Sequence, residues 1–118
     1  MKNENEILNE IDIYISYHLI CLNKLIKAFN GKTKPELTDC HSCPFGKKFN
    51  ELKNINHLSA KIKIFINEID NIHCDFHHVT YTASKEGLSP EKLEELNKIS
   101  DLLVHKLLKL KMIIKNSN

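Results

Sequence analysis

The part of the chain that decides the fold is the stretch CHSCPFGKKF, residues 40–49, together with the long segments on either side of it. The stretch carries two thiols, and it separates two helical patterns that each place histidine on an inner face. A polar connector, residues 32–39, leads into it, and Asn54–His57 breaks the pattern again. We therefore expect a turn followed by a short helix that ends at about Leu52.

Upstream of this stretch, apolar residues recur at spacings of three and four from about residue 5 to residue 29, the pattern of a helix that faces a bundle core. The helix should stop at Asn30-Gly31, and Pro35 should prevent its return. Its inner face consists of Ile7, Ile11, Tyr14, His18, Leu22, Leu25 and Phe29.

Downstream, a second long helix should begin at Leu58, run to about Ser84 and be capped by Gly87. A third should begin at Ser89-Pro90-Glu91, with Ser as the N-cap and Pro at the first helical position. The inner face of the second helix consists of Ile62, Phe65, Ile66, Ile69, Ile72, His73, Phe76 and His77, and that of the third of Leu93, Leu96, Ser100, Leu103, Leu107, Leu110 and Ile114.

Length and composition fit one packed domain over residues 1–118. The chain is 42% hydrophobic and has only three Gly and three Pro, which favours a packed, mostly helical chain over a disordered one. Short connections between long helices favour antiparallel neighbours. The sequence therefore predicts an all-α fold, an antiparallel four-helix bundle with three long helices and one short helix that carries the Cys-x-Phe-Gly turn.

The charge pattern argues against a nucleic-acid or membrane partner. Every one of the 17 basic residues is lysine and the net charge is +2, whereas nucleic-acid readers rely on arginine. No apolar run approaches the length of a membrane span, and the polar N-terminus does not resemble a signal peptide. We expect a cytoplasmic protein.

Three inward histidines and one turn cysteine are the candidate metal ligands: His18, Cys43, His73 and His77. The last two histidines lie one helical turn apart, so both imidazoles face the same side. In a core of Leu, Ile and Phe these groups would lack polar partners unless a metal joined them. Three imidazoles and one thiolate suit tetrahedral Zn²⁺. Because four protein ligands leave no position for water, we expect a structural or regulatory zinc site and not an enzyme.

Alternatives remain open at this point for the individual cysteines and for one histidine. A histidine on an apolar stripe, such as His18, is by default a hydrogen-bonded core residue. Cys40 and Cys43 have Cys-x-x-Cys spacing, which is compatible with a two-thiolate metal site or a redox disulfide. Cys21 and Cys74 are small core residues by default, although both are placed to serve as oxidation partners of Cys43.

Two acidic residues lie near the histidine pair in the sequence. Asp70 and Asp75 could orient imidazole N–H groups, as carboxylates often do around metal-binding histidines. Solvated surface carboxylates are the ordinary alternative. The remaining histidines are expected on the surface without a role: His41, His57, His78 and His105.

Three motifs stand in one order along the chain: Tyr17-His18-Leu19, Cys43-Pro44-Phe45-Gly46-Lys47 and His73-Cys74-Asp75-Phe76-His77. In kind, order and separation they resemble the motifs of the chemoreceptor zinc-binding domain family, usually called CZB, over nearly the whole chain. The resemblance implies a four-helix bundle whose zinc ligands are His18, Cys43, His73 and His77. Two positions depart from the family pattern, because Cys21 and Lys48 stand where aromatic residues are common. A less shielded site with a more labile metal is expected.

The resemblance also implies a function. Members of this family look like cytoplasmic sensor modules of chemoreceptors or diguanylate cyclases, often dimeric, that respond to zinc or to oxidants such as hypochlorous acid through the zinc-bound cysteine. No output domain is expected in this chain. Its signal should therefore pass through a homodimer interface or through a chemotaxis or cyclic-di-GMP signalling protein.

Two other classes compete with a sensor. A structural zinc bundle would use the ion only for folding energy. A hemerythrin-like bundle would bind iron or oxygen, but it needs more inward histidines and bridging carboxylates than this sequence offers.

Overall fold

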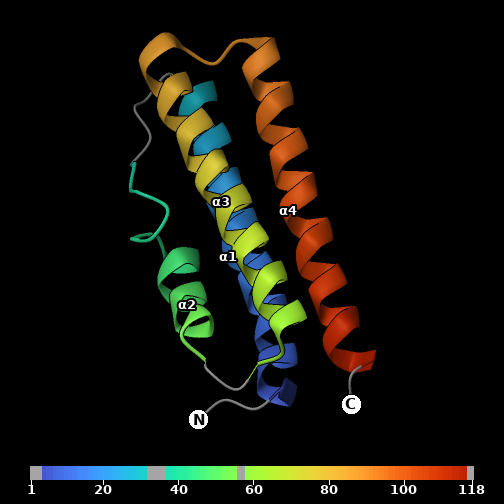
Figure 1. Ribbon diagram of the computed structural model, residues 1–118. Helices are drawn as coiled ribbons and strands as arrows, with labels where there is room; N and C mark the ends of the chain where they lie inside the picture. The colour runs from blue at the N-terminus through green and yellow to red at the C-terminus, as the bar shows by residue number, and fades with distance from the viewer. Residues whose placement is uncertain (1–3, 32–36, 56–57, 117–118) are drawn as a thin grey trace.

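The computed structural model describes residues 4–31, 37–55 and 58–116, and every regular element within these ranges is an α-helix. The elements are α1 (Glu4–Asn30), α2 (Pro44–Lys53), α3 (Ala60–Glu86) and α4 (Pro90–Asn116). Three are long and the one that comes after the cysteine turn is short, as Figure 1 shows. The predicted all-α, antiparallel four-helix bundle is confirmed.

The helix ends obey local signals in the sequence. The Gly31 amide donates to the carbonyl of Lys27 just beyond the end of α1, at 2.9 Å. Gly87 ends α3 with a φ of +92°, a backbone conformation that favours glycine. The Ser89 hydroxyl accepts a hydrogen bond from the Lys92 amide at 3.1 Å and so caps α4. Pro35, predicted to block the return of α1, lies outside the described residues.

The short helix fills one wall of the bundle over part of its length. α4 packs along both α1 and α3, and α2 packs against the same two helices from the other side. α1 and α3 therefore lie diagonally opposite each other, with their neighbours antiparallel (Figure 1). Since α2 has 10 residues and each long helix has 27, the α2 wall covers only part of the space between α1 and α3.

The predicted inner faces form the core, which consists of two apolar clusters. The larger is built around α2 and includes Phe45, Phe49, Ile11, Ile62 and Leu107. The smaller, toward the other end of the bundle, consists of Leu25, Phe76, Val79 and Leu96 with partly buried neighbours.

A layer of buried polar residues lies in the helix stretches where the two clusters meet. His18, His73 and Ser100 are each at most 3% exposed and come from α1, α3 and α4. Each stands between an apolar residue of one cluster and one of the other on its own helix, as His73 does between Ile69 and Phe76. Burial of polar groups in this position requires partners. The polar layer is therefore where the candidate site lies.

Candidate metal centre

Cys43 is fixed at the start of α2 by its role as the N-cap residue. Its Sγ accepts a hydrogen bond from the Gly46 amide at 3.2 Å, and its carbonyl accepts one from the Lys47 amide at 2.9 Å. The side chain is 5% exposed and forms no disulfide. Burial raises the pKa of the Cys43 thiol, and backbone N–H groups, Gly46 first, oppose the shift.

Gly46 allows the cysteine turn to fold back on α2. A Cβ atom at this position would lie 1.9 Å from the carbonyl oxygen of Cys40, which is backbone and cannot swing aside. Only glycine lets the turn pass this close. The Cys-x-Phe-Gly pattern thus has a direct steric basis, because its glycine lets the chain place Cys43 against α3.

The predicted histidine pair faces Cys43 from α3. His73 Nε2 lies 3.2 Å from Cys43 Sγ, and the rings of His73 and His77 are 4.6 Å apart between centroids. One donor atom from each of these three residues lies within 4.8 Å of the others, a spacing that could hold a metal ion. The Phe45 ring, 4.2 Å away, stacks on the imidazole of His73 and fixes its plane.

The tautomer of His77 is set by its hydrogen bond. Its Nδ1 lies 2.9 Å from the carbonyl oxygen of Thr38, and a carbonyl can only accept, so Nδ1 carries the proton. Nε2 of the neutral ring then keeps its lone pair. This nitrogen is buried and has no hydrogen-bond partner among the described residues. Metal-binding histidines are typically oriented by such a second hydrogen bond.

His18 approaches from α1 but stands outside the group of three. Its Nε2 lies 2.7 Å from the Ser100 hydroxyl of α4, and its ring packs edge-on against Phe76 at 4.8 Å. Its Nδ1 is buried and, within the described ranges, makes no hydrogen bond. The structure therefore places His18 beside Cys43, His73 and His77 without bringing its nitrogen into their 4.8 Å set.

All three imidazoles are held neutral by their surroundings. Burial lowers the pKa of His18 to about 4, with His77 adding to the effect. Burial lowers the pKa of His73 to about 3, His77 and His18 add to this, and Asp70 and the backbone of Cys40 oppose it. Burial also lowers the pKa of His77, against the Thr38 hydrogen bond. Neutral rings are the form that binds metal.

The donor set fits a zinc ion. His18 Nδ1, His73 Nδ1 and His77 Nε2 are buried without hydrogen bonds in the part of the chain that is described. Each such group costs about 1–3 kcal/mol when left unpaired. A thiolate with imidazoles is a usual zinc donor set. A metal at Cys43, His73 and His77 would give the partnerless Nε2 of His77 a partner, and Zn²⁺ is the ion whose chemistry these residues match.

The other cysteines differ from expectation. Cys40 and Cys74 form a disulfide across 34 residues of sequence, whereas Cys21 and Cys43 are free. Cys74 is thus the partner of Cys40 and not of Cys43, and the Cys-x-x-Cys pair does not form a disulfide of its own. The prediction that the thiols serve as metal ligands or reactive groups rather than disulfides was wrong for this pair. No local pattern indicates it, because the two residues become neighbours only when the turn docks on α3.

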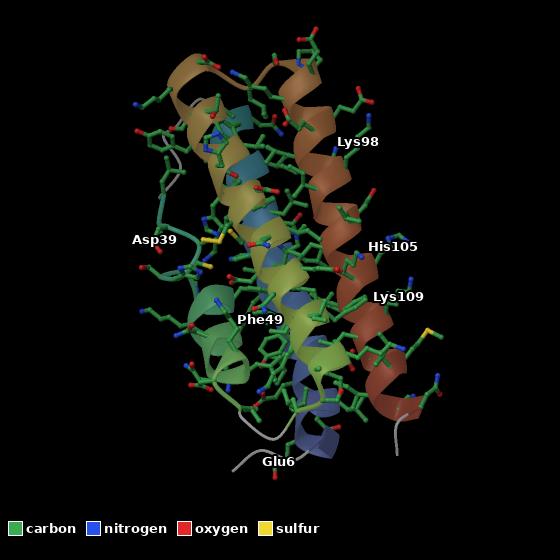
Figure 2. All side chains as sticks on the ribbon, viewed as in Figure 1. Glu6, Asp39, Phe49, Lys98, His105 and Lys109 are labelled. Carbon is green, nitrogen blue, oxygen red and sulfur yellow. A yellow bond between two sulfur atoms is a disulfide. The ribbon has the colours of Figure 1, made fainter. Side chains whose placement is uncertain are left out.

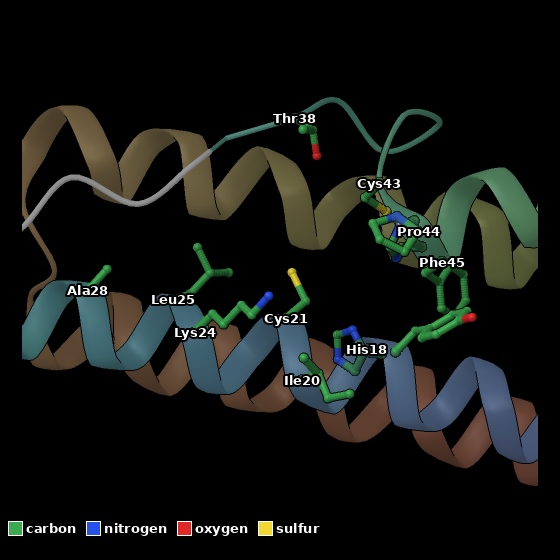
Figure 3. A pocket seen from close by; sticks show the side chains of 12 residues that line it. His18, Ile20, Cys21, Lys24, Leu25, Ala28, Thr38, Cys43, Pro44 and Phe45 are labelled. Carbon is green, nitrogen blue, oxygen red and sulfur yellow. Dashed lines mark hydrogen bonds between the residues drawn. The ribbon is translucent and has the colours of Figure 1, made fainter.

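A cavity of about 570 Å³ lies beside Cys43, where α2 no longer covers the gap between α1 and α3. His18, Cys21 and Lys24 line it from α1, and Cys43 and Phe45 line it from the α2 side. Figure 3 shows the Cys21 side chain extending from α1 into this space. Burial raises the pKa of Cys21, with Cys43 adding to the shift. The cavity gives small solutes a route to the edge of the candidate site.

The predicted acidic neighbours do not orient the ligand histidines by hydrogen bonds. Asp70 pairs with Lys53 at 2.9 Å and lies 3.4 Å from His41 Nε2, and Asp75 is exposed. The groups that do contact ligand imidazoles, the Ser100 hydroxyl and the Thr38 carbonyl, were not singled out. A serine on the apolar stripe of α4 was the available signal for Ser100, but a backbone carbonyl leaves none.

The surface predictions agree with the structure where it describes them. His41, His78 and His105 are exposed, and His57 lies outside the described residues. Across the described ranges, no helix is both long enough and apolar enough to cross a membrane.

Fold and site together define a four-helix bundle with a buried Cys/His group that could hold a metal ion. A scan against protein-family models and searches of curated proteins and of solved structures found no match to this chain.

Proposed function

We propose that this chain is a zinc-binding regulatory domain of the chemoreceptor zinc-binding kind, with His18, Cys43, His73 and His77 as ligands. The supporting observation is the buried layer in which three neutral imidazoles, each with a nitrogen that has no hydrogen-bond partner among the described residues, surround one buried free thiol. Cys43, His73 and His77 are already within 4.8 Å, and His18 is the fourth ligand that a small shift of α1 brings in.

The proposed response centres on Cys43, because this residue is both a ligand and the N-cap of α2. A bound zinc ion keeps such a thiol in its thiolate form. Hypochlorous acid converts the thiolate to sulfenic acid and chloride, RS⁻ + HOCl → RSOH + Cl⁻, and this removes the anionic donor. The change alters the cap at the same time. α2 is thus the element that responds to zinc loss or oxidation.

The cavity gives the oxidant a path. It reaches Cys43 from the side where Cys21 takes the place of the aromatic residue common in the chemoreceptor family. The output passes to a second copy of the chain or to a chemotaxis or cyclic-di-GMP signalling protein that recognises the position of α2.

Two observations bear on the other classes. Neither donor group in the described residues contains a carboxylate, which disfavours a hemerythrin-like iron site. A purely structural zinc would occupy the same ligands, and the two roles differ in the consequence of zinc release. Sensing requires that mild oxidation release zinc reversibly and change dimerisation or partner binding.

The first experiment measures zinc by native mass spectrometry in a Cys40→Ser/Cys74→Ser background, which leaves only the proposed site. We expect one zinc per chain, lost on Cys43→Ser. Serine is a good N-cap, so this variant removes the thiolate while α2 keeps its cap. Cys21→Ser, at the other free thiol, is the matched control and should keep its zinc. Retention of zinc by the Cys43→Ser variant, or absence of zinc from its parent, contradicts the proposal.

A further inference from the structure

A second group of soft donor atoms lies outside the site described above. Cys40 Sγ, His41 Nε2 and Cys74 Sγ lie within 4.8 Å of one another and share no residue with the Cys43 group. His41 Nε2 is 3.8 Å from Cys74 Sγ. Figure 2 shows the disulfide sulfurs in yellow between the Asp39 turn and α3.

The turn that carries this second group is shaped by Asp39. One carboxylate oxygen accepts from the His41 amide at 2.8 Å, and the other accepts from the Ser42 hydroxyl at 2.9 Å. These bonds place the His41 ring over the face of α3 that carries Cys74. They involve neither sulfur, so they persist when the disulfide is reduced.

The second group also differs from the first in its access to solvent. His41 is exposed and the two cysteines are half-buried, whereas Cys43 and His73 are buried. Asp70 Oδ2 lies 3.4 Å from His41 Nε2 and adds negative charge beside the donors. Lys53, at 2.9 Å from the same oxygen, offsets part of that charge. Solvent and metal ions can reach this group without opening the core.

We propose that in the dithiol form Cys40, His41 and Cys74 bind a second zinc ion, and that forming the disulfide expels it. Two thiolates and one imidazole match the donors of known three-ligand zinc sites, with the fourth position left to solvent. Tetrahedral binding at about 2.3 Å from each sulfur sets the sulfurs about 3.8 Å apart, and side-chain rotation about Cα–Cβ provides that separation once the S–S bond is broken.

The exchange is a two-electron oxidation by a peroxide. The two thiolates lose one electron each and join through a new S–S bond, while the O–O bond breaks: Zn(SR)₂ + H₂O₂ + 2H⁺ → RS–SR + Zn²⁺ + 2H₂O. The structure corresponds to the oxidised product. The second site goes beyond the proposed function, since it uses different ligands and holds zinc only under reducing conditions.

The test compares zinc content by native mass spectrometry with and without a phosphine reductant that does not bind zinc. Reduced wild type should carry one zinc more than the disulfide form, whose mass verifies the bond. The Cys40→Ser/Cys74→Ser variant should show no difference between the two conditions. Cys21→Ser should behave like wild type. Adding one equivalent of peroxide to the reduced, zinc-loaded chain should release zinc in step with disulfide formation.

The His41→Ala variant separates binding from disulfide chemistry. It keeps both thiols, so the disulfide still forms, but the extra zinc should be held at least 10-fold more weakly because one of three ligands is gone. Equal zinc content in the reduced and oxidised wild type overturns this inference, whether or not the Cys43 site holds metal. Zinc that appears only on reduction and is lost in Cys40→Ser/Cys74→Ser supports it even if the Cys43 site binds none.

Discussion

At the scale of single residues, the turn before α2 depends on one glycine. Gly46 is buried, and its Cα faces the carbonyl of Cys40. The same carbonyl lies 3.7 Å from Cys43 Sγ, so the turn, the cap of α2 and the thiol ligand are tied to one close backbone contact.

Gly46→Ala should therefore impair the site without changing any ligand. The added methyl would lie 1.9 Å from the Cys40 oxygen, and the turn must move to relieve the overlap. We expect a loss of about 1–3 kcal/mol in the free energy of unfolding, as for other overpacked positions, together with weaker zinc binding. Urea unfolding and zinc titration measure the two effects. Lys47→Ala, at the exposed next position, is the control, and equal zinc affinity in both variants would contradict this explanation.

Residue-scale chemistry also explains which nitrogens are available to metal. His77 donates from Nδ1 to Thr38, which leaves Nε2 for a ligand bond, and His18 uses Nε2 on Ser100, which leaves Nδ1. The sequence indicated that these histidines face inward. It did not indicate which ring nitrogen is free, because that depends on partners from the connector and from α4.

At the scale of elements, α2 is held to the bundle mainly by aromatic contacts. Phe49 is fully buried, stacks on Phe45 at 5.3 Å and meets Tyr14 of α1 edge-on at 5.5 Å. A helix of 10 residues is too short to be stable in isolation. Its position, and with it the position of Cys43, comes from these contacts.

Phe49→Ala should consequently loosen α2 and weaken metal binding from a distance. Removing a fully buried ring costs about 3–5 kcal/mol, and the loss falls on the element that carries Cys43. Hydrogen exchange should show α2 amides losing protection before those of α3 and α4. Asn50→Ala, an exposed neighbour on the same helix, should change neither protection nor zinc affinity. Uniform loss of protection over all helices would mean that α2 is not a separable element.

At the scale of the whole molecule, the two apolar clusters meet at a layer of neutral histidines, and this makes stability depend on pH. The pKa of His18 is about 4 and that of His73 about 3 in the folded chain, against 6.5 without burial. Between those values the unfolded chain binds more protons than the native one. The sign is therefore fixed: stability is fully present above about pH 7 and is lost as the pH falls below 6.5.

Metal-free protein should lose up to about 1.4 kcal/mol of unfolding free energy per pH unit for each buried histidine between about pH 6.5 and 4. Urea unfolding at several pH values in a chelator measures the slope. His18→Leu should reduce it, because that position no longer titrates. His105→Gln, at an exposed histidine, should leave it unchanged. A flat profile in the wild type would show that the buried histidines do not resist protonation.

Local sequence was enough to predict the helices and their inner faces. Apolar spacing, Gly87 and Ser89 act over short distances, and the buried residues of α1, α3 and α4 are those that the periodicity marks, His18, His73 and Ser100 included. The Cys-x-Phe-Gly turn also indicated that Cys43 would begin a short helix. These features depend on neighbours a few residues away, so a linear reading captures them. The ligand set remains a prediction.

The partners of those residues, in contrast, were set by the packing of the helices. The Cys40–Cys74 disulfide, the Thr38 carbonyl on His77 and the Ser100 hydroxyl on His18 join positions 34 to 82 residues apart. The second donor group around His41 exists only because the turn docks on α3. The physical reason is that such contacts depend on how whole helices pack, and a one-turn change in that packing would replace every partner while leaving the local pattern unchanged.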